Sequence, residues 1–141
     1  MILLLGGTSD TAPLATLLAG AGYGVLVSTA SDVELDIGTH ERISRRSGPL
    51  DRQAMMELAR SIRANAIVDA THPYAAEASR TASEVARTLR LPYFAFVRPP
   101  ALCSADEGVM FAKDHPEAAG RAFSLGRPVL LTTGANNLSV Y

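Results

Sequence analysis

Residues 1–29, MILLLGGTSDTAPLATLLAGAGYGVLVST, predict a strand, a glycine turn, a helix and a second strand, in that order. Met1–Leu5 is continuously apolar and ends at glycine, which is typical of a short buried strand. Thr11–Ala21 has leucines at helical spacing, with Pro13 near its start, where a missing N–H costs little. Gly24–Thr29 is a second apolar run. This order predicts a βαβ unit with two parallel strands.

The rest of the chain continues the alternation of strands and helices. Glu41–Arg46 alternates weakly and predicts a short exposed strand, and Asp51 is the expected N-cap of a helix that runs to about Arg63. We expect the further elements to be strands at Ala66–Asp69, Tyr93–Val97, Val109–Phe111 and Pro128–Thr132, and helices at Tyr74–Leu89 and Pro116–Leu125. The sequence therefore predicts an α/β fold, a Rossmann-like, mainly parallel sheet with helices on both faces.

The composition is that of an ordinary globular domain. The 141 residues are 48% hydrophobic and 19% charged, and the net charge of −1 indicates neither a nucleic-acid partner nor attraction to an anionic membrane. No apolar run approaches the roughly 18 residues of a membrane span, and Met1–Leu5 lacks the length and basic start of a signal peptide. A single cysteine, Cys103, excludes an intramolecular disulfide, so we expect a cytoplasmic protein.

Polar residues follow the predicted strands and form the candidate site. In an open parallel sheet, ligands bind beyond the carboxyl ends of the strands. The stretches at these ends are small, hydroxylated or able to hydrogen-bond, unlike the aliphatic strands that precede them: Gly6–Ser9, Ser28–Thr29, Asp69–Tyr74, Arg98–Pro100 and Thr132–Gly134. We therefore expect a ligand at this edge of the sheet.

The first of these stretches, Gly6-Gly7-Thr8-Ser9, has the character of a phosphate-binding turn. Its glycines allow the backbone to approach a ligand, the following helix offers N–H groups, and the two hydroxyls are further donors. It is not a G-x-G-x-x-G motif, and no lysine follows as in a Walker A loop. Two interpretations stay open, a dinucleotide phosphate site and a tight turn with a helix cap.

The tip of the second strand is expected to contact the ribose. An acidic residue there favours NAD, and a nearby arginine favours NADP. Ser28 and Thr29 are hydroxyl residues, and Asp32 follows three positions later. Three arginines between residues 42 and 46 are candidates for this tip, although ordinary surface charge also explains them. The choice between NADPH and NADH stays open.

The stretch after the third core strand contains Thr71, His72 and Pro73, and the proline suits the first turn of the next helix. Anions bind well near a helix N-terminus, and a histidine there tends to be neutral. His72 is therefore a candidate catalytic residue; alternatively, Asp69 or Thr71 caps the helix and His72 is an ordinary hydrogen-bonding side chain. The remaining histidines have no cysteine or carboxylate at ligand spacing, so we expect no metal site.

Taken together and in order, the segments LLLGGTSD, SGPLD, VDATHPYAAEAS, FVRPP and LLTTGANNL resemble the N-terminal half of the precorrin-6A reductase family, cobalt-precorrin-6A reductase included. The string DATHPYA is the most specific of them, and the resemblance extends from Met1 to Tyr141. It implies an enzyme of cobalamin biosynthesis that transfers hydride from NADPH, or NADH in some members, to the corrin-type macrocycle precorrin-6A, giving precorrin-6B. It also implies two Rossmann-like domains, of which residues 1–141 would be the first, with a second domain or partner needed to close the cleft.

The resemblance also implies roles for individual residues. Gly6, Gly7, Thr8 and Ser9 would hold the dinucleotide phosphates. Thr71, His72 and Pro73 would line the nicotinamide side of the cleft. Arg98 would bind a substrate carboxylate or a cofactor phosphate. Thr132, Thr133 and Gly134 would border the cleft between the domains. Many relatives have a tryptophan soon after the Arg-Pro pair, whereas this chain has none.

Two other classes of function remain as alternatives. One is a dinucleotide-binding module or fragment without catalysis of its own. The other is a Rossmann-like redox enzyme that acts on a different substrate, such as a sugar nucleotide. The Tyr-x-x-x-Lys pair common in that second group is missing, because no tyrosine is followed by a lysine four residues on.

Overall fold

The computed structural model describes residues 1–98, 108–133 and 135–141, with the backbone alone for residues 135 and 136. The chain divides into two compact units, Met1–Arg98 and Pro99–Tyr141. All strands of the described residues lie in the first unit. In the described part of the chain, no helix is both long and apolar enough to span a membrane.

The first unit is built on one five-stranded sheet. The strands are β1 (Ile2–Leu5), β2 (Val25–Thr29), β3 (Ile43–Ser47), β4 (Ala66–Asp69) and β5 (Tyr93–Ala95). Their order is β3-β2-β1-β4-β5, and every neighbouring pair is parallel. The chain moves outward from β1 to β3 and then crosses back to β4, so the strand order reverses between β1 and β4, as in doubly wound folds. The predicted Rossmann-like parallel sheet is confirmed.

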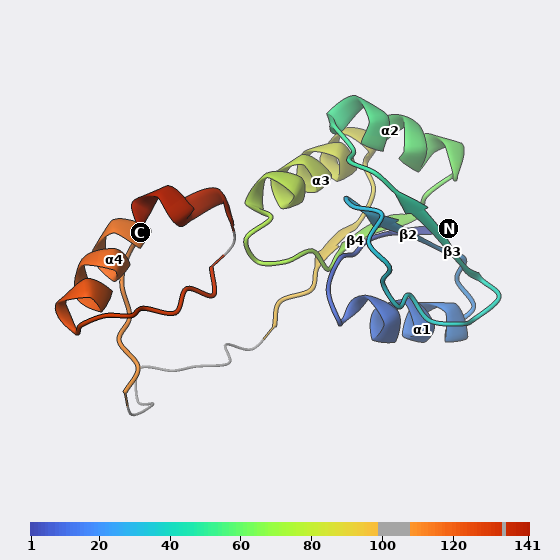
Figure 1. Cartoon of the computed structure of the whole chain (residues 1–141). Coiled ribbons are helices and arrows are strands. Elements are labelled where there is room, and N and C mark those ends of the chain that lie inside the picture. The colour runs from blue at the N-terminus through green and yellow to red at the C-terminus, as the bar shows by residue number, and fades with distance from the viewer. Residues whose placement is uncertain (99–107, 134) are drawn as a thin grey trace. The chain divides into compact units, whose positions relative to one another are not determined.

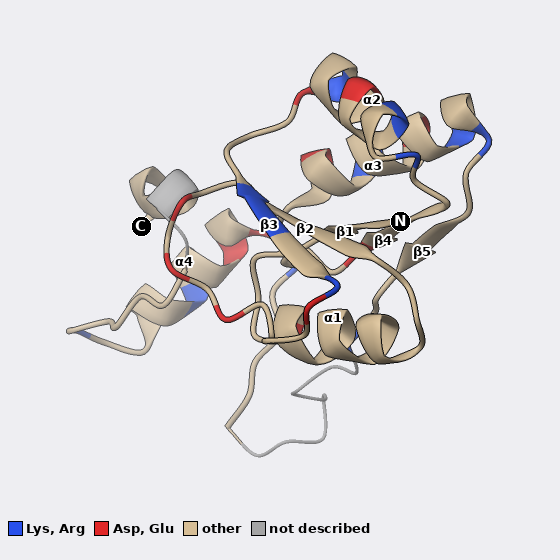
Figure 2. Ribbon diagram, turned by 90° about the vertical axis from the view of Figure 1, so that its right-hand side faces the viewer, with Lys and Arg blue, Asp and Glu red and all other residues tan. Residues whose placement is uncertain are grey.

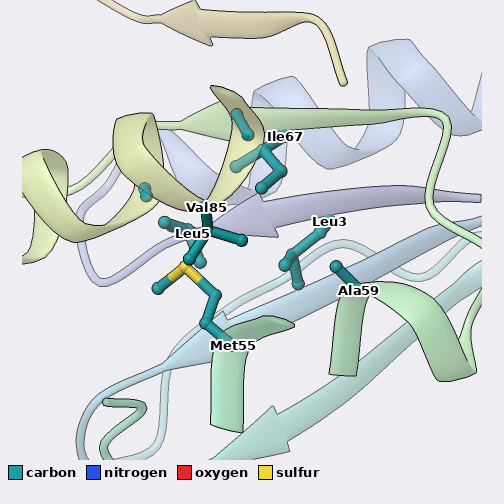
Figure 3. Close-up of a cluster of buried hydrophobic side chains, with 8 residues drawn as sticks. Leu3, Leu5, Met55, Ala59, Ile67 and Val85 are labelled. Carbon is teal, nitrogen blue, oxygen red and sulfur yellow. The ribbon is translucent and has the colours of Figure 1, made fainter. Parts of the chain in front are cut away.

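Helices cover both faces of the sheet, as predicted. Figure 1 shows α1 (Thr11–Gly20) on one face and α2 (Arg52–Ser61) and α3 (Ala76–Leu89) on the other. Successive strand residues point to opposite faces, and all four residues of β1 are buried because each face has its own cover. Leu3 and Leu5 pack with α2 and α3 (Figure 3), whereas Leu4 packs with α1.

Local signals place the helix starts. The Asp51 carboxylate accepts a hydrogen bond of 2.8 Å from the Ala54 N–H, which confirms the predicted N-cap of α2. By contrast, α3 begins at Ala76, two residues later than predicted. The chain first makes a turn in which the Ala75 N–H donates to the His72 carbonyl at 2.8 Å. Neither Asp69 nor Thr71 caps this helix, because the N-cap position is Ala75.

The second unit contains α4 (His115–Ser124) and a 3-10 helix, η1 (Ala135–Val140). The Asp114 carboxylate caps α4 through a 2.9 Å hydrogen bond from the Glu117 N–H. The strands predicted at Val109–Phe111 and Pro128–Thr132 are wrong, since neither run forms a strand. A strand needs a partner for its backbone hydrogen bonds, and neither run pairs with another described segment. Leu130, in the middle of the second run, is 88% exposed.

Candidate functional site

A pocket of about 660 Å³ lies at the carboxyl edge of the sheet in the first unit. Four strand tips contribute to what we call the strand-tip pocket. Its lining includes Gly6 and Gly7 after β1, Ser28–Ser31 at the end of β2, Gly48–Arg52 after β3, and Thr71 and His72 after β4. The structure therefore brings six of the residues predicted to bind a cofactor into one cavity. Thr8, Ser9 and Pro73 are not part of its lining.

The two glycines of the first turn serve different purposes. A Cβ atom on Gly6 would lie 2.6 Å from the Thr11 Cγ2 atom, so Gly6 is needed for close packing against α1. Gly7 has φ +132°, a backbone conformation that L side chains rarely adopt, and nothing lies within 4 Å of a Cβ atom built there. Gly7 therefore leaves its side of the turn open for a ligand to approach the backbone.

The Thr11 hydroxyl stabilises this turn, a role that the sequence analysis missed. Its Oγ1 atom accepts hydrogen bonds from the N–H groups of Gly7 and Thr8, at 3.1 and 3.2 Å. Thr11 is fully buried at the first position of α1. A threonine four residues after the second of two glycines is the sequence signal that would have pointed to it. The backbone N–H groups of Ser9 and Asp10 have no acceptor among the described residues, so they are the donors of this turn that remain for an anion.

The Thr8 hydroxyl links two strand tips. It is buried and donates a 3.2 Å hydrogen bond to the carbonyl oxygen of Ala70, directly after β4. β1 and β4 are the neighbours between which the strand order reverses, so the bond ties the glycine turn to the Thr71–His72 segment. In this structure the hydroxyl therefore holds the two halves of the site together, and its predicted contact with a phosphate stays a prediction.

Asp69 organises the tip of β4. It is 4% exposed, and its carboxylate accepts hydrogen bonds from the Thr71 N–H, the Thr71 hydroxyl and the Tyr93 hydroxyl, at 3.0, 2.7 and 2.7 Å. Burial pulls the pKa of Asp69 upward, but hydrogen bonds from Ser79, Thr71 and Tyr93 outweigh burial and hold the pKa below its ordinary value. Burial and the neighbouring carboxylate raise the pKa of Tyr93 to about 12. Asp69 therefore stays ionised and positions the segment that carries His72.

His72 is exposed and lines the strand-tip pocket. Its Nδ1 atom accepts a 3.3 Å hydrogen bond from the Tyr74 N–H, so in the neutral ring the proton is on Nε2. The other two histidines have local partners: the His40 Nδ1 atom accepts from the Arg42 N–H, and the His115 Nδ1 atom lies 2.9 Å from the Tyr141 hydroxyl oxygen. Within the described ranges, no three His, Cys, Asp or Glu side chains are grouped as a metal site would require.

The predicted substrate residues are found in different places. Arg98 forms an ion pair with Asp10, the residue before α1, and its Nη2 atom is buried without a hydrogen-bond partner in the described part of the chain. This places the Arg98 guanidinium beside the N-terminus of α1. Thr132 and Thr133 lie in the second unit, whereas Gly134 is outside the described residues.

The sheet order and the glycine turn define the class of this chain, a Rossmann-like α/β protein. A solved structure named CobK precorrin-6A reductase matches it with a TM-score of 0.63 and 27% sequence identity, over 74% of this chain and 41% of that chain. The model of the family described as "Precorrin-6x reductase CbiJ/CobK" matches residues 1–141. The chain therefore belongs to the precorrin-6x reductase family.

Curated relatives agree with the family assignment. The cobalt-precorrin-6A reductase of Priestia megaterium is 34% identical over 144 residues, which cover 100% of this chain and 55% of that protein. The precorrin-6A reductase of Rhodococcus erythropolis is 31% identical, over 99% of this chain and 56% of that protein. The chain thus spans about half the length of the curated relatives that it matches.

Proposed function

We propose that this chain is the cofactor-binding half of an NAD(P)H-dependent reductase that converts precorrin-6A, or its cobalt form, to precorrin-6B. The observation that carries the proposal is the convergence of Gly6, Gly7, Ser28, Thr29, Thr71 and His72 on one pocket. Membership of the family and the names of the curated relatives support the same reaction. We propose the cytoplasm as its place.

The residues of the strand-tip pocket suit a dinucleotide. Gly7 allows close approach, and the N–H groups of Ser9 and Asp10, which follow Gly7 along the chain outside the pocket lining, suit the phosphates. The hydroxyls of Ser28 and Thr29 suit the ribose at the tip of β2, and Thr71 and Pro73 flank His72 on the nicotinamide side. A bound reduced nicotinamide would supply the hydride. We propose NADPH as the preferred donor, with NADH as the alternative.

His72 is the catalytic candidate. Hydride addition to a conjugated double bond makes the acceptor electron-rich, and the Nε2–H of a neutral His72 is not used by its contact with Tyr74. We propose that His72 donates this hydrogen bond to the reacting double-bond system beside the nicotinamide and that water supplies the proton that the reduction consumes. Asp69 acts only as a positioning residue, because its carboxylate holds Thr71 and remains ionised.

The substrate side of the site needs more than the first unit. A macrocycle that carries carboxylates suits arginine, and the Arg98 Nη2–H is a donor with no acceptor among the described residues. We propose that Thr132, Thr133 and Gly134 border the substrate and that a second domain or a partner completes the cleft. The runner-up is a dinucleotide-binding module without catalysis of its own, whose site would be the strand-tip pocket alone.

The experiment that tests this proposal is a calorimetric titration of the 141-residue chain with NADPH and then with NADH. We expect saturable binding of at least one of them, with one site per chain. Reduction of precorrin-6A should then require NAD(P)H and the second domain. Absence of binding by either nucleotide, with the domain folded, would contradict the cofactor role of the strand-tip pocket. Binding without reduction after the second domain is added would favour the non-catalytic module.

A further inference from the structure

Tyr74, the aromatic residue of the DATHPYA string, is almost fully exposed. Its exposed fraction is 87%, more than that of any other large hydrophobic residue described in the first unit. Its hydroxyl has no hydrogen-bond partner among the described residues. An aromatic ring in water gives up the favourable free energy that its burial would supply. The packing of the first unit therefore does not explain an aromatic side chain at this position.

A tight turn holds Tyr74 in place. The Ala75 N–H donates to the His72 carbonyl at 2.8 Å, which closes a four-residue turn with Pro73 and Tyr74 at its centre. Proline suits the second position of such a turn because its ring fixes φ. The Tyr74 N–H also donates to the His72 Nδ1 atom, at 3.3 Å. Before the turn, the carboxylate at the end of β4 accepts from the Thr71 N–H and hydroxyl. The segment is therefore held on both sides, and an ordered backbone presents the Tyr74 ring.

The Tyr74 ring contacts the ring of His72, the catalytic candidate. The two ring centroids are 4.9 Å apart, and the ring planes are tilted by 51°. His72 and Ala75 line the strand-tip pocket, whereas Tyr74 does not. The Tyr74 ring therefore extends the site beyond the lining of the pocket. A molecule that reaches His72 from outside the pocket would meet the Tyr74 ring as well.

The charged residues next to the turn do not favour an anionic group there. The helix that follows the turn, α3, carries two glutamates and two arginines, and Figure 2 shows both signs along it. Glu77, in the first turn of α3, lines the strand-tip pocket. A carboxylate or phosphate beside Tyr74 would meet the like charge of Glu77. The exposed ring therefore suits an uncharged, apolar part of a ligand.

We infer that the Tyr74 ring is a platform for the substrate, which packs against the conjugated ring system of the macrocycle and holds it beside His72. The inference rests on the proposed function, since it assumes that a corrin-type macrocycle is the hydride acceptor. Contact between two π-systems adds to the free energy of the apolar area that is buried. The nicotinamide is also an aromatic ring, but the dinucleotide is expected inside the pocket, and Tyr74 lies outside its lining. Tyr74 should therefore contribute to binding of the macrocycle and not of the dinucleotide.

The test is steady-state reduction of precorrin-6A by a protein that joins this chain to its second domain. Tyr74→Leu removes the ring but keeps an apolar side chain, so the KM for the macrocycle should rise about tenfold. The kcat and the KM for NADPH should stay within about twofold. Tyr74→Phe keeps the ring, and its KM for the macrocycle should stay within about threefold of the unaltered value. Tyr23→Leu is the matched control, because Tyr23 is also exposed but lies between α1 and β2 and does not line the strand-tip pocket.

The two kinetic constants separate a platform from a merely structural role. If Tyr74 only supports the turn that carries His72, Tyr74→Leu should lower kcat and leave the KM for the macrocycle unchanged, and the inference is overturned. A rise in the KM for NADPH alone would assign Tyr74 to the dinucleotide and would overturn it too. In both cases precorrin-6A is still reduced, so the proposed function stands. If the unaltered protein reduces precorrin-6A with neither NADPH nor NADH, the proposed function fails and the inference with it.

Discussion

The first unit has two hollows of similar size and opposite chemistry. The strand-tip pocket, about 660 Å³, is lined by glycines, hydroxyls, a histidine and charged groups. A second hollow of about 530 Å³, which we call the apolar groove, lies between α1 and the β4–β5 side of the sheet. Apart from Asn65 and the Tyr23 hydroxyl its lining is apolar and includes Leu14, Leu17 and Leu18 of α1 and Phe94 and Phe96 at β5.

The comparison shows that size does not identify the site. The groove contains no titratable group except the hydroxyl of Tyr23, and nothing in it is suited to a phosphate or a hydride acceptor. The pocket gathers polar atoms from four chain segments that are far apart in sequence but share one edge of the sheet. Polar groups that converge where the strand order reverses therefore identify the binding site better than the size of a cavity does.

The largest effect should come from the turn that opens the pocket. Gly7→Asp forces a side chain onto a backbone at φ +132° and places a negative charge where phosphates bind, so dinucleotide affinity should fall by about a hundredfold or more. Gly22→Asp is the matched control. Gly22 also has positive φ and nothing within 4 Å of an added Cβ atom, but it follows the C-terminal end of α1, at the edge of the sheet opposite the pocket. Calorimetric titration of both variants measures the difference in dinucleotide affinity. An equal loss of affinity in the two variants would mean that the glycine turn is not part of the binding site.

His72→Ala tests the chemistry of the pocket. In a protein that joins this chain to its second domain, the turnover number should fall about tenfold to a hundredfold, whereas the free energy of unfolding should hardly change because His72 is exposed. His40→Ala is the control, since the Nδ1 atom of each histidine accepts the N–H two residues further on. Turnover that is unchanged in the His72 variant would make His72 a structural residue.

Tyr93→Phe tests, through the pH dependence of stability, the hydrogen bond from the Tyr93 hydroxyl to Asp69. The folded-state pKa of Tyr93 lies above the ordinary value of 10, at about 12, so the neutral phenol stabilises the folded chain fully below pH 10. That stability is lost as the pH rises from 10 to 12. The variant should be less stable by about 1 kcal/mol at pH 8 and should lack the alkaline loss. Urea unfolding between pH 8 and 12 measures this difference. Tyr23 is exposed, so Tyr23→Phe is the control and should show the same dependence of stability on pH as the unaltered chain.

The smallest effect is expected in the apolar groove. Leu17 is 70% exposed there, so Leu17→Gln should change the free energy of unfolding by no more than about 0.5 kcal/mol. Its affinity for NADPH should stay within twofold of the unaltered chain. A larger drop in affinity would mean that the two hollows are coupled, and the contrast between them would need revision.

Much of the first unit could be predicted because the residues that stabilise its elements are close together in the sequence. The βαβ unit at the start of the chain and the Asp51 cap depend on neighbours in sequence, and the structure confirms both. The run Pro128–Thr132 has three consecutive aliphatic residues, yet apolar character alone does not provide a strand with a hydrogen-bonded neighbour. The same limit explains why this strand was predicted wrongly.

In the candidate site, positions could be predicted but contacts could not. Strand tips of a parallel sheet must share one edge, so Gly6, Ser28 and Thr71 were expected to meet. The bond between Thr8 and the Ala70 carbonyl joins residues 62 positions apart, and the Arg98–Asp10 ion pair joins residues 88 apart. Such pairs depend on side-chain geometry that appears only when the sheet has formed.

The Thr11 hydroxyl has a consequence for how a ligand would be received. It already fixes the N–H groups of Gly7 and Thr8, so the turn is held in place without the help of a ligand. A segment that is ordered beforehand loses little conformational entropy on association, and more of the contact energy then appears as affinity. Removing this hydroxyl would leave every glycine in place but would lower both the association rate and the affinity of the ligand.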